Sequence, residues 1–171
     1  MKKVFLAAFL LFFFLTSKVF ADSSYVLPYP SFMPGNKFYR LQEIKDTLLQ
    51  YWYFGDFGQF TYNLKQADKY LVEAKTLFEY KQYLLAYTAL QKSNKHFIKA
   101  PYYLEEAKKN HKNISENYKL LQEASRKHLE ILNKLKKELP VNVTWSPEKA
   151  TATELNLNNL INKAIKIRLA I

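Results

Sequence analysis

Residues 102–139 read YYLEEAKKNHKNISENYKLLQEASRKHLEILNKLKKEL and decide the fold class. Mostly apolar residues recur in this stretch at alternating steps of three and four, the heptad spacing of a helix that packs along one face. Glu and Lys lie four residues apart on the other face, as on a solvated helix surface. We therefore expect one long heptad-patterned helix between Pro101 and Pro140. Its packed face would consist of Leu104, Ala107, His111, Ile114, Tyr118, Leu121, Ser125, His128, Leu132, Leu135 and Leu139.

The composition of the whole chain also favours helices. Glycine is scarce, at 3 of 171 residues, whereas sheets with many tight turns usually need more of it. A content of 49% hydrophobic and 24% charged residues is that of a globular chain, and the length suits one domain. The absence of cysteine excludes disulfides and thiol chemistry. We expect an all-α fold, a four- or five-helix bundle.

Helices are also expected on both sides of residues 102–139. Residues 37–54 carry one apolar face, and a second helix follows over 57–79. A third helix ends near residue 99, and it is either separated from the second by a short break at 80–82 or continuous with it. Pro101 should then kink or divide the chain. The helical domain thus spans 37–139, with a loop at 140–146 and a C-terminal helix at 147–171 that begins at a Ser-Pro-Glu capping sequence. The apolar residues of the first two helices are Leu41, Ile44, Leu48 and Trp52, then Phe60, Leu64, Ala67, Leu71, Ala74 and Phe78.

The N-terminus has the three parts of a secretory signal peptide. Lys2 and Lys3 precede the apolar run VFLAAFLLFFFL at residues 4–15, and Val-Phe-Ala at 19–21 fits a cleavage site between Ala21 and Asp22. Twelve helical residues span only about 18 Å, against roughly 30 Å of hydrocarbon, so we expect cleavage rather than an uncleaved anchor. The protein is therefore predicted to be exported, either secreted or associated with the cell envelope. The mature chain would begin with a Pro-rich arm at residues 22–36.

The chain is strongly basic, which limits the partners to expect. Its formal net charge is +11, and about +8 remains without residues 1–21, with 23 basic against 15 acidic residues. Such a surface either serves solubility or attracts an anionic envelope polymer or an anionic membrane surface. Nucleic acid is an unlikely partner for an exported protein. A protein partner is also compatible with this charge.

No motif in the sequence indicates catalysis, a cofactor or a metal. His111 and His128 lie 17 residues apart, about 25 Å along one helix, so they cannot share a metal there. Acids sit beside Lys or Arg, as in ion pairs, and no glycine-rich phosphate loop occurs. We therefore predict a noncatalytic binding or scaffolding domain. An enzyme with a dispersed site would need His96, His128 and a carboxylate in one pocket.

One aromatic turn is the candidate binding surface. Rings around a tight turn either stack on a ligand or close the end of a bundle, and the sequence leaves both open. The aromatic arm residues Tyr25, Tyr29 and Phe32 offer the same choice. The residues of the turn are Tyr51, Trp52, Tyr53, Phe54 and Phe57.

Several short patterns, in order, resemble a family of exported bacterial helical proteins that forms a domain of unknown function. They are Leu-Pro-x-Pro at 27–30, Met-Pro-Gly at 33–35, Ala-Asp-Lys-x-Leu-x-Glu-Ala at 67–74 and Lys-His-Leu-Glu-Ile-Leu at 127–132. The resemblance covers roughly residues 25–140. It implies a helical extracytoplasmic domain, with no assigned activity and no catalytic residues. It draws attention to His128 without giving it a role.

Overall fold

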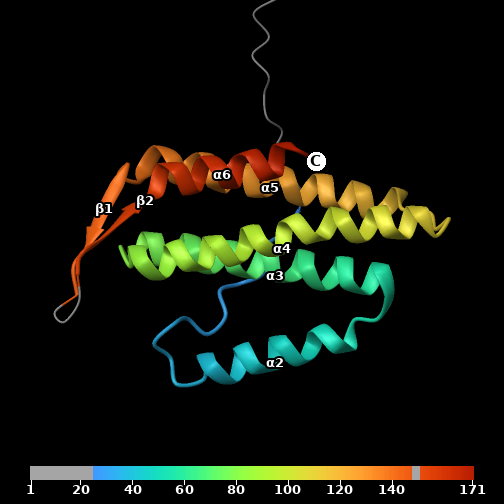
Figure 1. Ribbon diagram of the computed structural model, residues 1–171, viewed down its shortest axis with the longest axis horizontal. Helices are drawn as coiled ribbons and strands as arrows, with labels where there is room; N and C mark the ends of the chain where they lie inside the picture. Colours follow the sequence, from blue (N-terminus) through green and yellow to red (C-terminus); the bar gives the residue numbers. More distant parts are fainter. Residues whose placement is uncertain (1–24, 148–150) are drawn as a thin grey trace, which may run out of the picture.

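The computed structural model describes residues 25–147 and 151–171. These residues are mostly helical, as predicted, and one small two-stranded sheet is added near the C-terminus. The helices α3 and α4 form an antiparallel pair in the middle, α5 and α6 cover one side of it, and α2 lies on the other side (Figure 1). The elements are α2 (Tyr39–Trp52), α3 (Gly55–Glu79), α4 (Tyr83–Lys109), α5 (Ser115–Glu138), β1 (Asn142–Trp145), β2 (Thr153–Asn156) and α6 (Leu157–Leu169).

The two core clusters lie between the α3–α4 pair and the helices α5 and α6. The stripe predicted on the second helix is confirmed, since each of its six members is at most 3% exposed. One cluster joins α3 and α4 to α5, α6 and Leu155 of β2. The other lies toward the opposite end of α3 and is built around Phe60, Phe97 and Leu121. Helix α2 contributes no residue to either cluster, and its only buried residue is Asp46.

Of the two alternatives at residues 80–82, the short break is confirmed. Lys81 adopts a left-handed backbone conformation, with φ of 58°. The amide of Gln82 donates to the carbonyl of Leu77, which closes the end of α3 and reverses the chain into α4.

Of the two outcomes left open at Pro101, a kink or a division of the chain, the division is wrong. Helix α4 continues through Pro101 to Lys109. Proline removes one backbone donor, but Phe97, Ala100 and Leu104 are packed in the core around it, and this packing holds the helix together.

The prediction of one long helix over 102–139 is therefore also wrong. The chain leaves the helix at Asn110, and His111 takes a left-handed conformation with φ of 57°. The amide of Lys112 donates to the carbonyl of Ala107, and helix α5 then begins at Ser115. His111 is consequently exposed in a turn and is not part of a packed heptad face.

The loop predicted at 140–146 and the helix predicted at 147–171 also need correction. Strands β1 and β2 form an antiparallel pair in which Val143 lies opposite Leu155. Leu155 is buried in the core cluster near the α3–α4 turn, which ties the hairpin to the helices. Helix α6 begins only at Leu157, where the Asn156 side chain accepts a hydrogen bond of 2.7 Å from the amide of Asn159.

Candidate functional site

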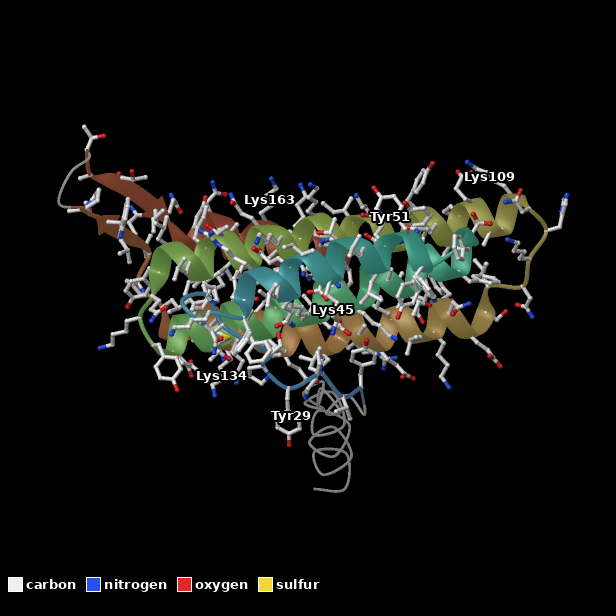
Figure 2. All side chains as sticks on the ribbon, turned by 90° about the horizontal axis from the view of Figure 1, so that it is seen from below. Tyr29, Lys45, Tyr51, Lys109, Lys134 and Lys163 are labelled. Atoms are coloured by element: carbon white, nitrogen blue, oxygen red, sulfur yellow. The ribbon has the colours of Figure 1, made fainter. Side chains whose placement is uncertain are left out.

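Helix α2 turns its apolar face away from the body of the protein. The predicted face exists, but it points outward: Leu41, Ile44, Leu48 and Trp52 are 61%, 57%, 62% and 79% exposed. Figure 2 looks onto this side and shows Lys45 and Tyr51 on α2 in front of α3 and α4. A helix of a soluble bundle normally buries its apolar face against the core. The orientation of α2 is therefore the reverse of the one expected from its sequence.

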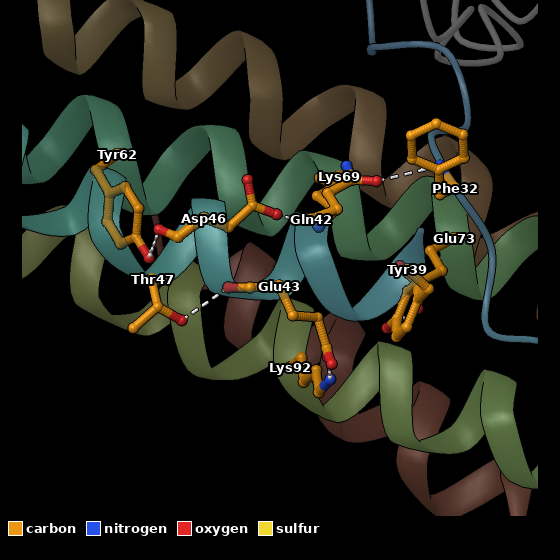
Figure 3. Close-up of polar contacts among 10 residues, drawn as sticks. All are labelled: Phe32, Tyr39, Gln42, Glu43, Asp46, Thr47, Tyr62, Lys69, Glu73 and Lys92. Atoms are coloured by element: carbon orange, nitrogen blue, oxygen red, sulfur yellow. Dashed lines mark hydrogen bonds and ion pairs between the residues drawn. The ribbon is translucent and has the colours of Figure 1, made fainter. Parts of the chain in front are cut away.

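The inward face of α2 is polar, and it is held to α3 and α4 by charged and hydroxyl groups (Figure 3). The Tyr39 hydroxyl donates to Glu73 Oε1 over 2.9 Å. Lys92 Nζ donates to Glu43 Oε1 over 2.7 Å, and Lys69 pairs with Asp46. These contacts bind both carboxylates of α2 to the body of the protein and fix which face of α2 is left outside.

The charge that remains unpaired on α2 and just before it is positive. Lys37, Arg40 and Lys45 make no ion pair with any residue in 25–147 or 151–171. Glu43 and Asp46, by contrast, point inward and are paired with lysines. The exposed face of α2 thus combines large apolar side chains with unpaired cations.

A groove of about 730 Å³ runs between α2 and α4, over α3. The rings of Tyr62 and Tyr70 line it, and the His96 ring stacks on Tyr70 with a centroid separation of 5.9 Å. Arg40 lines one wall and Lys95 and Lys99 the other. The groove is therefore aromatic in its interior and cationic at its sides.

The electrostatics of the groove are visible in His96. The pKa of His96 is lowered to about 4. Burial is the main cause, and the positive charges of Lys99, Lys95, Lys69 and Lys92 contribute the rest. The imidazole is therefore neutral at physiological pH, in a positive local potential.

The Pro-rich arm packs along α2 and α3. The Phe32 ring lies 5.7 Å from that of Phe38, and the Phe32 amide donates to Gln42 Oε1 over 3.2 Å. Further along, the Tyr25 hydroxyl donates to Asp68 Oδ2 over 2.6 Å. Tyr29, which the sequence grouped with these residues, is almost fully exposed. The arm thus leaves the outer face of α2 open.

No protein-family model matches the chain, and no significant match was found among curated proteins or solved structures.

The residues of the predicted aromatic turn divide into two groups. Tyr51, Trp52 and Phe54 are exposed and extend the apolar face of α2. Tyr53 packs against the Tyr62 ring at 5.8 Å, and Phe57 packs against the core cluster that contains Phe60. The structure thus places three rings outside and two inside.

The three histidines do not come together. His96 lines the groove. The ring of the adjacent Phe97 lies in the core, with its centroid 5.1 Å from that of the His128 ring. His111 is in the exposed turn. Among the described residues, no three His, Asp or Glu side chains are grouped as metal ligands.

His128 belongs to a buried polar network that the sequence did not predict. His128 Nε2 is 2.7 Å from Asp68 Oδ1, and its Nδ1 accepts from Arg168 Nε over 3.3 Å. Because Arg168 only donates, Nδ1 is unprotonated and Nε2 carries the proton given to Asp68. The Arg168 guanidinium also donates to Ser93 Oγ over 2.8 Å and to Asn94. The one available signal was spacing, since Arg168 continues the buried positions Leu157, Ile161 and Ala164.

The predicted cleavage site between Ala21 and Asp22 lies outside the described residues. Within the part of the chain that the structure describes, none of the helices has the length and apolar content needed to span a membrane.

Proposed function

We propose that the protein is an exported, noncatalytic binding domain that attaches to the anionic membrane surface of the cell envelope through the outer face of α2. The observation that supports this proposal is the orientation of α2, whose polar face is bound to the protein and whose apolar face is exposed. Exposed large apolar side chains in one contiguous face are typical of interaction surfaces.

A membrane surface fits this face better than an apolar protein groove because of the charges beside it. Lys37, Arg40 and Lys45 flank or interrupt the apolar residues, and both carboxylates of α2 are turned inward. Helices that lie in a membrane interface combine aromatic and leucine side chains with cations that reach the headgroups. Trp52 and Tyr51 at the end of α2 are residue types that favour this interface.

The buried location of the His128–Asp68 pair supports a noncatalytic function. His128 is fully buried and Asp68 is 4% exposed, with the Tyr25 hydroxyl on its second oxygen. Asp68 borders a pocket between the arm, α2 and α3, but its two oxygens are bonded to Tyr25 and His128, so a substrate would have to displace one of these partners. The network therefore fits a structural role better than a chemical one.

Sedimentation with lipid vesicles tests the proposal. A chain of residues 22–171 retains every contact described above, because all of these contacts involve residues from Tyr25 onward. We expect it to pellet with vesicles that contain phosphatidylglycerol at low salt, and to pellet less at high salt, which screens surface charges. Vesicles of phosphatidylcholine alone should bind it more weakly.

Matched variants assign the binding to α2. Burial of a leucine contributes about 1.5–3 kcal/mol, so Leu41→Gln/Leu48→Gln should weaken binding at least about tenfold. Leu120→Gln makes one such substitution at an exposed leucine of α5, which lies on the far side of the α3–α4 pair, and should leave binding unchanged. Equal binding by all three proteins would contradict the proposal. A dimer that forms without lipid and dissociates in Leu41→Gln/Leu48→Gln would assign the face to self-association instead.

A further inference from the structure

The groove between α2 and α4 has the charge of an anion site. Arg40, Lys95 and Lys99 line it and form no ion pair within the described residues. The two carboxylates at its α2 side, Glu43 and Asp46, are each bound to a lysine that neutralises them. The groove therefore has three uncompensated positive charges on two opposite walls.

The groove also offers hydrogen-bonding groups that have no charge. Gln66 lines it, is 7% exposed, and makes no side-chain hydrogen bond with any described residue. The Gln66 amide is not among the fully buried unpartnered groups of the described residues, so it is open to the groove. There it can donate to one ligand oxygen and accept from another.

The second uncharged group is His96. Its Nδ1 lies 3.0 Å from Asn63 Oδ1, while the Asn63 amide donates to the Gln59 carbonyl over 2.8 Å. Because Asn63 Oδ1 only accepts, Nδ1 carries the proton of the neutral ring, and Nε2 is left as an acceptor. An acceptor beside cations suits a ligand that has hydroxyl groups next to an anionic group.

We infer that the groove binds the phosphate ester of a polyol. Its phosphate is bound by Arg40, Lys95 and Lys99, and its hydroxyl groups by Gln66 and His96. The Tyr62 and Tyr70 rings supply an apolar contact for the carbon chain. A phosphatidylglycerol headgroup and a soluble polyol phosphate share this chemistry. The groove shares Arg40, Ile44 and Leu48 with the surface proposed to meet the membrane, but a soluble ligand tests the inference without membrane attachment.

Binding of glycerol 3-phosphate, followed by calorimetry and by the histidine imidazole resonances, tests the inference. We expect saturable binding that shifts the His96 resonance, identified by its loss in His96→Gln, and leaves the resonance of exposed His111 unchanged. The bound anion stabilises the imidazolium, so the pKa of His96 measured by titration should rise. Inorganic phosphate should bind several-fold more weakly because it has no carbon-bound hydroxyl groups. Equal affinity for both probes would overturn the role assigned to Gln66 and His96.

Charge-matched variants separate a site from general attraction to a basic protein. Lys95→Gln/Lys99→Gln should weaken binding at least tenfold. Its helix content, measured by circular dichroism, should equal that of the parent. Lys136→Gln/Lys137→Gln removes the same charge from exposed positions on α5 and should bind as the parent does. Equal losses in both variants, or no shift of the His96 resonance, would overturn the inference.

Vesicles then distinguish the two sources of the ligand. If phosphatidylglycerol vesicles shift the His96 resonance and phosphatidylserine vesicles do not, the inference holds with a lipid headgroup as ligand. If only soluble glycerol phosphate shifts it, the inference holds with a soluble ligand. The soluble probe involves no membrane, so the groove can fail this test while attachment through α2 holds, and the reverse.

Discussion

Replacing Asp68 with asparagine should destabilise the protein more than any other change of one acid to its amide. Asp68 accepts from the Tyr25 hydroxyl over 2.6 Å and from His128 Nε2 over 2.7 Å. Asp68 is the carboxylate of the buried network that contains the Arg168 guanidinium. The His128 ring connects the two side chains, since Arg168 donates to its Nδ1. The pKa of Arg168 is lowered by burial to about 9, so Arg168 stays charged at pH 7. The asparagine variant leaves this charge buried without a counter-charge.

The size of the effect follows from that unpaired charge. Removing one partner of a buried ion pair costs about 3–5 kcal/mol, a large part of the roughly 5–15 kcal/mol that stabilises an ordinary domain. The free energy of unfolding is measured by urea denaturation with circular dichroism at pH 7. Asp56→Asn is the matched control, since Asp56 pairs with Lys112 at the surface, where ion pairs contribute little.

The double variant Asp68→Asn/Arg168→Met should regain part of the lost stability, because it removes the uncompensated charge along with its partner. If Asp68→Asn loses no more stability than Asp56→Asn, then Asp68 is not the counter-charge of Arg168, and His128 does not link a buried charge pair.

Three further predictions concern stability. The pKa of His96 is lowered to about 4 in the folded protein, so below pH 6.5 the unfolded chain binds more protons than the folded one. The free energy of unfolding should therefore fall by roughly 1 kcal/mol between pH 7 and 5, after allowance for solvent screening. Urea titrations of His96→Gln should show a smaller fall, and an identical fall would contradict this cause. Gly58→Ala should destabilise by about 1–3 kcal/mol, because its Cβ would lie 2.8 Å from the carbonyl carbon of Tyr53, and a gain in melting temperature would refute the clash. Phe60→Ala in the core should cost about 3–5 kcal/mol, whereas Trp52→Ala should change the free energy of unfolding by less than about 0.5 kcal/mol; similar losses would mean that α2 is packed.

Local periodicity predicted a helix correctly where its apolar stripe is buried in the core. The stripe from Phe60 to Phe78 could be read from spacing because it is the face of α3 that meets the two apolar core clusters, although other sides of α3 are also buried. The same spacing was misleading over 102–139. There the steps of three and four continue across Asn110 and His111, although the chain turns at that point. The polar run Lys-Lys-Asn-His-Lys-Asn at 108–113 was the available signal, since Asn is a weak helix former.

Other features depend on tertiary contacts that a sequence pattern does not contain. Pro101 stays inside α4 because the core packs around it. The β1–β2 hairpin had a local signal, the alternation of Val-Asn-Val-Thr-Trp at 141–145, but its anchor, Leu155, is fixed by contacts with distant helices. Spacing identified the apolar face of α2 correctly and gave no indication of its direction. The direction is set by the partners of Glu43 and Asp46 on two other helices.

Only part of the candidate site was predicted from the sequence. The exposed aromatic residues of α2 and its turn were singled out from the sequence, but the groove was not, because its cations come from α2 and α4. The export signal, the cleavage site and the resemblance to a domain of unknown function also stay predictions.

The fluorescence of Trp52 tests membrane attachment through α2 most directly. The chain has two tryptophans, so a Trp145→Phe background leaves Trp52 as the only tryptophan, and excitation at wavelengths that tyrosine does not absorb isolates its emission. Trp52 is 79% exposed, and in buffer its emission should be that of a solvated indole. With phosphatidylglycerol vesicles we expect a blue shift and quenching by brominated acyl chains, since the indole enters the interface. A protein that pellets with these vesicles while the emission of Trp52 stays unshifted and unquenched would contradict attachment through α2, because binding would then use another surface.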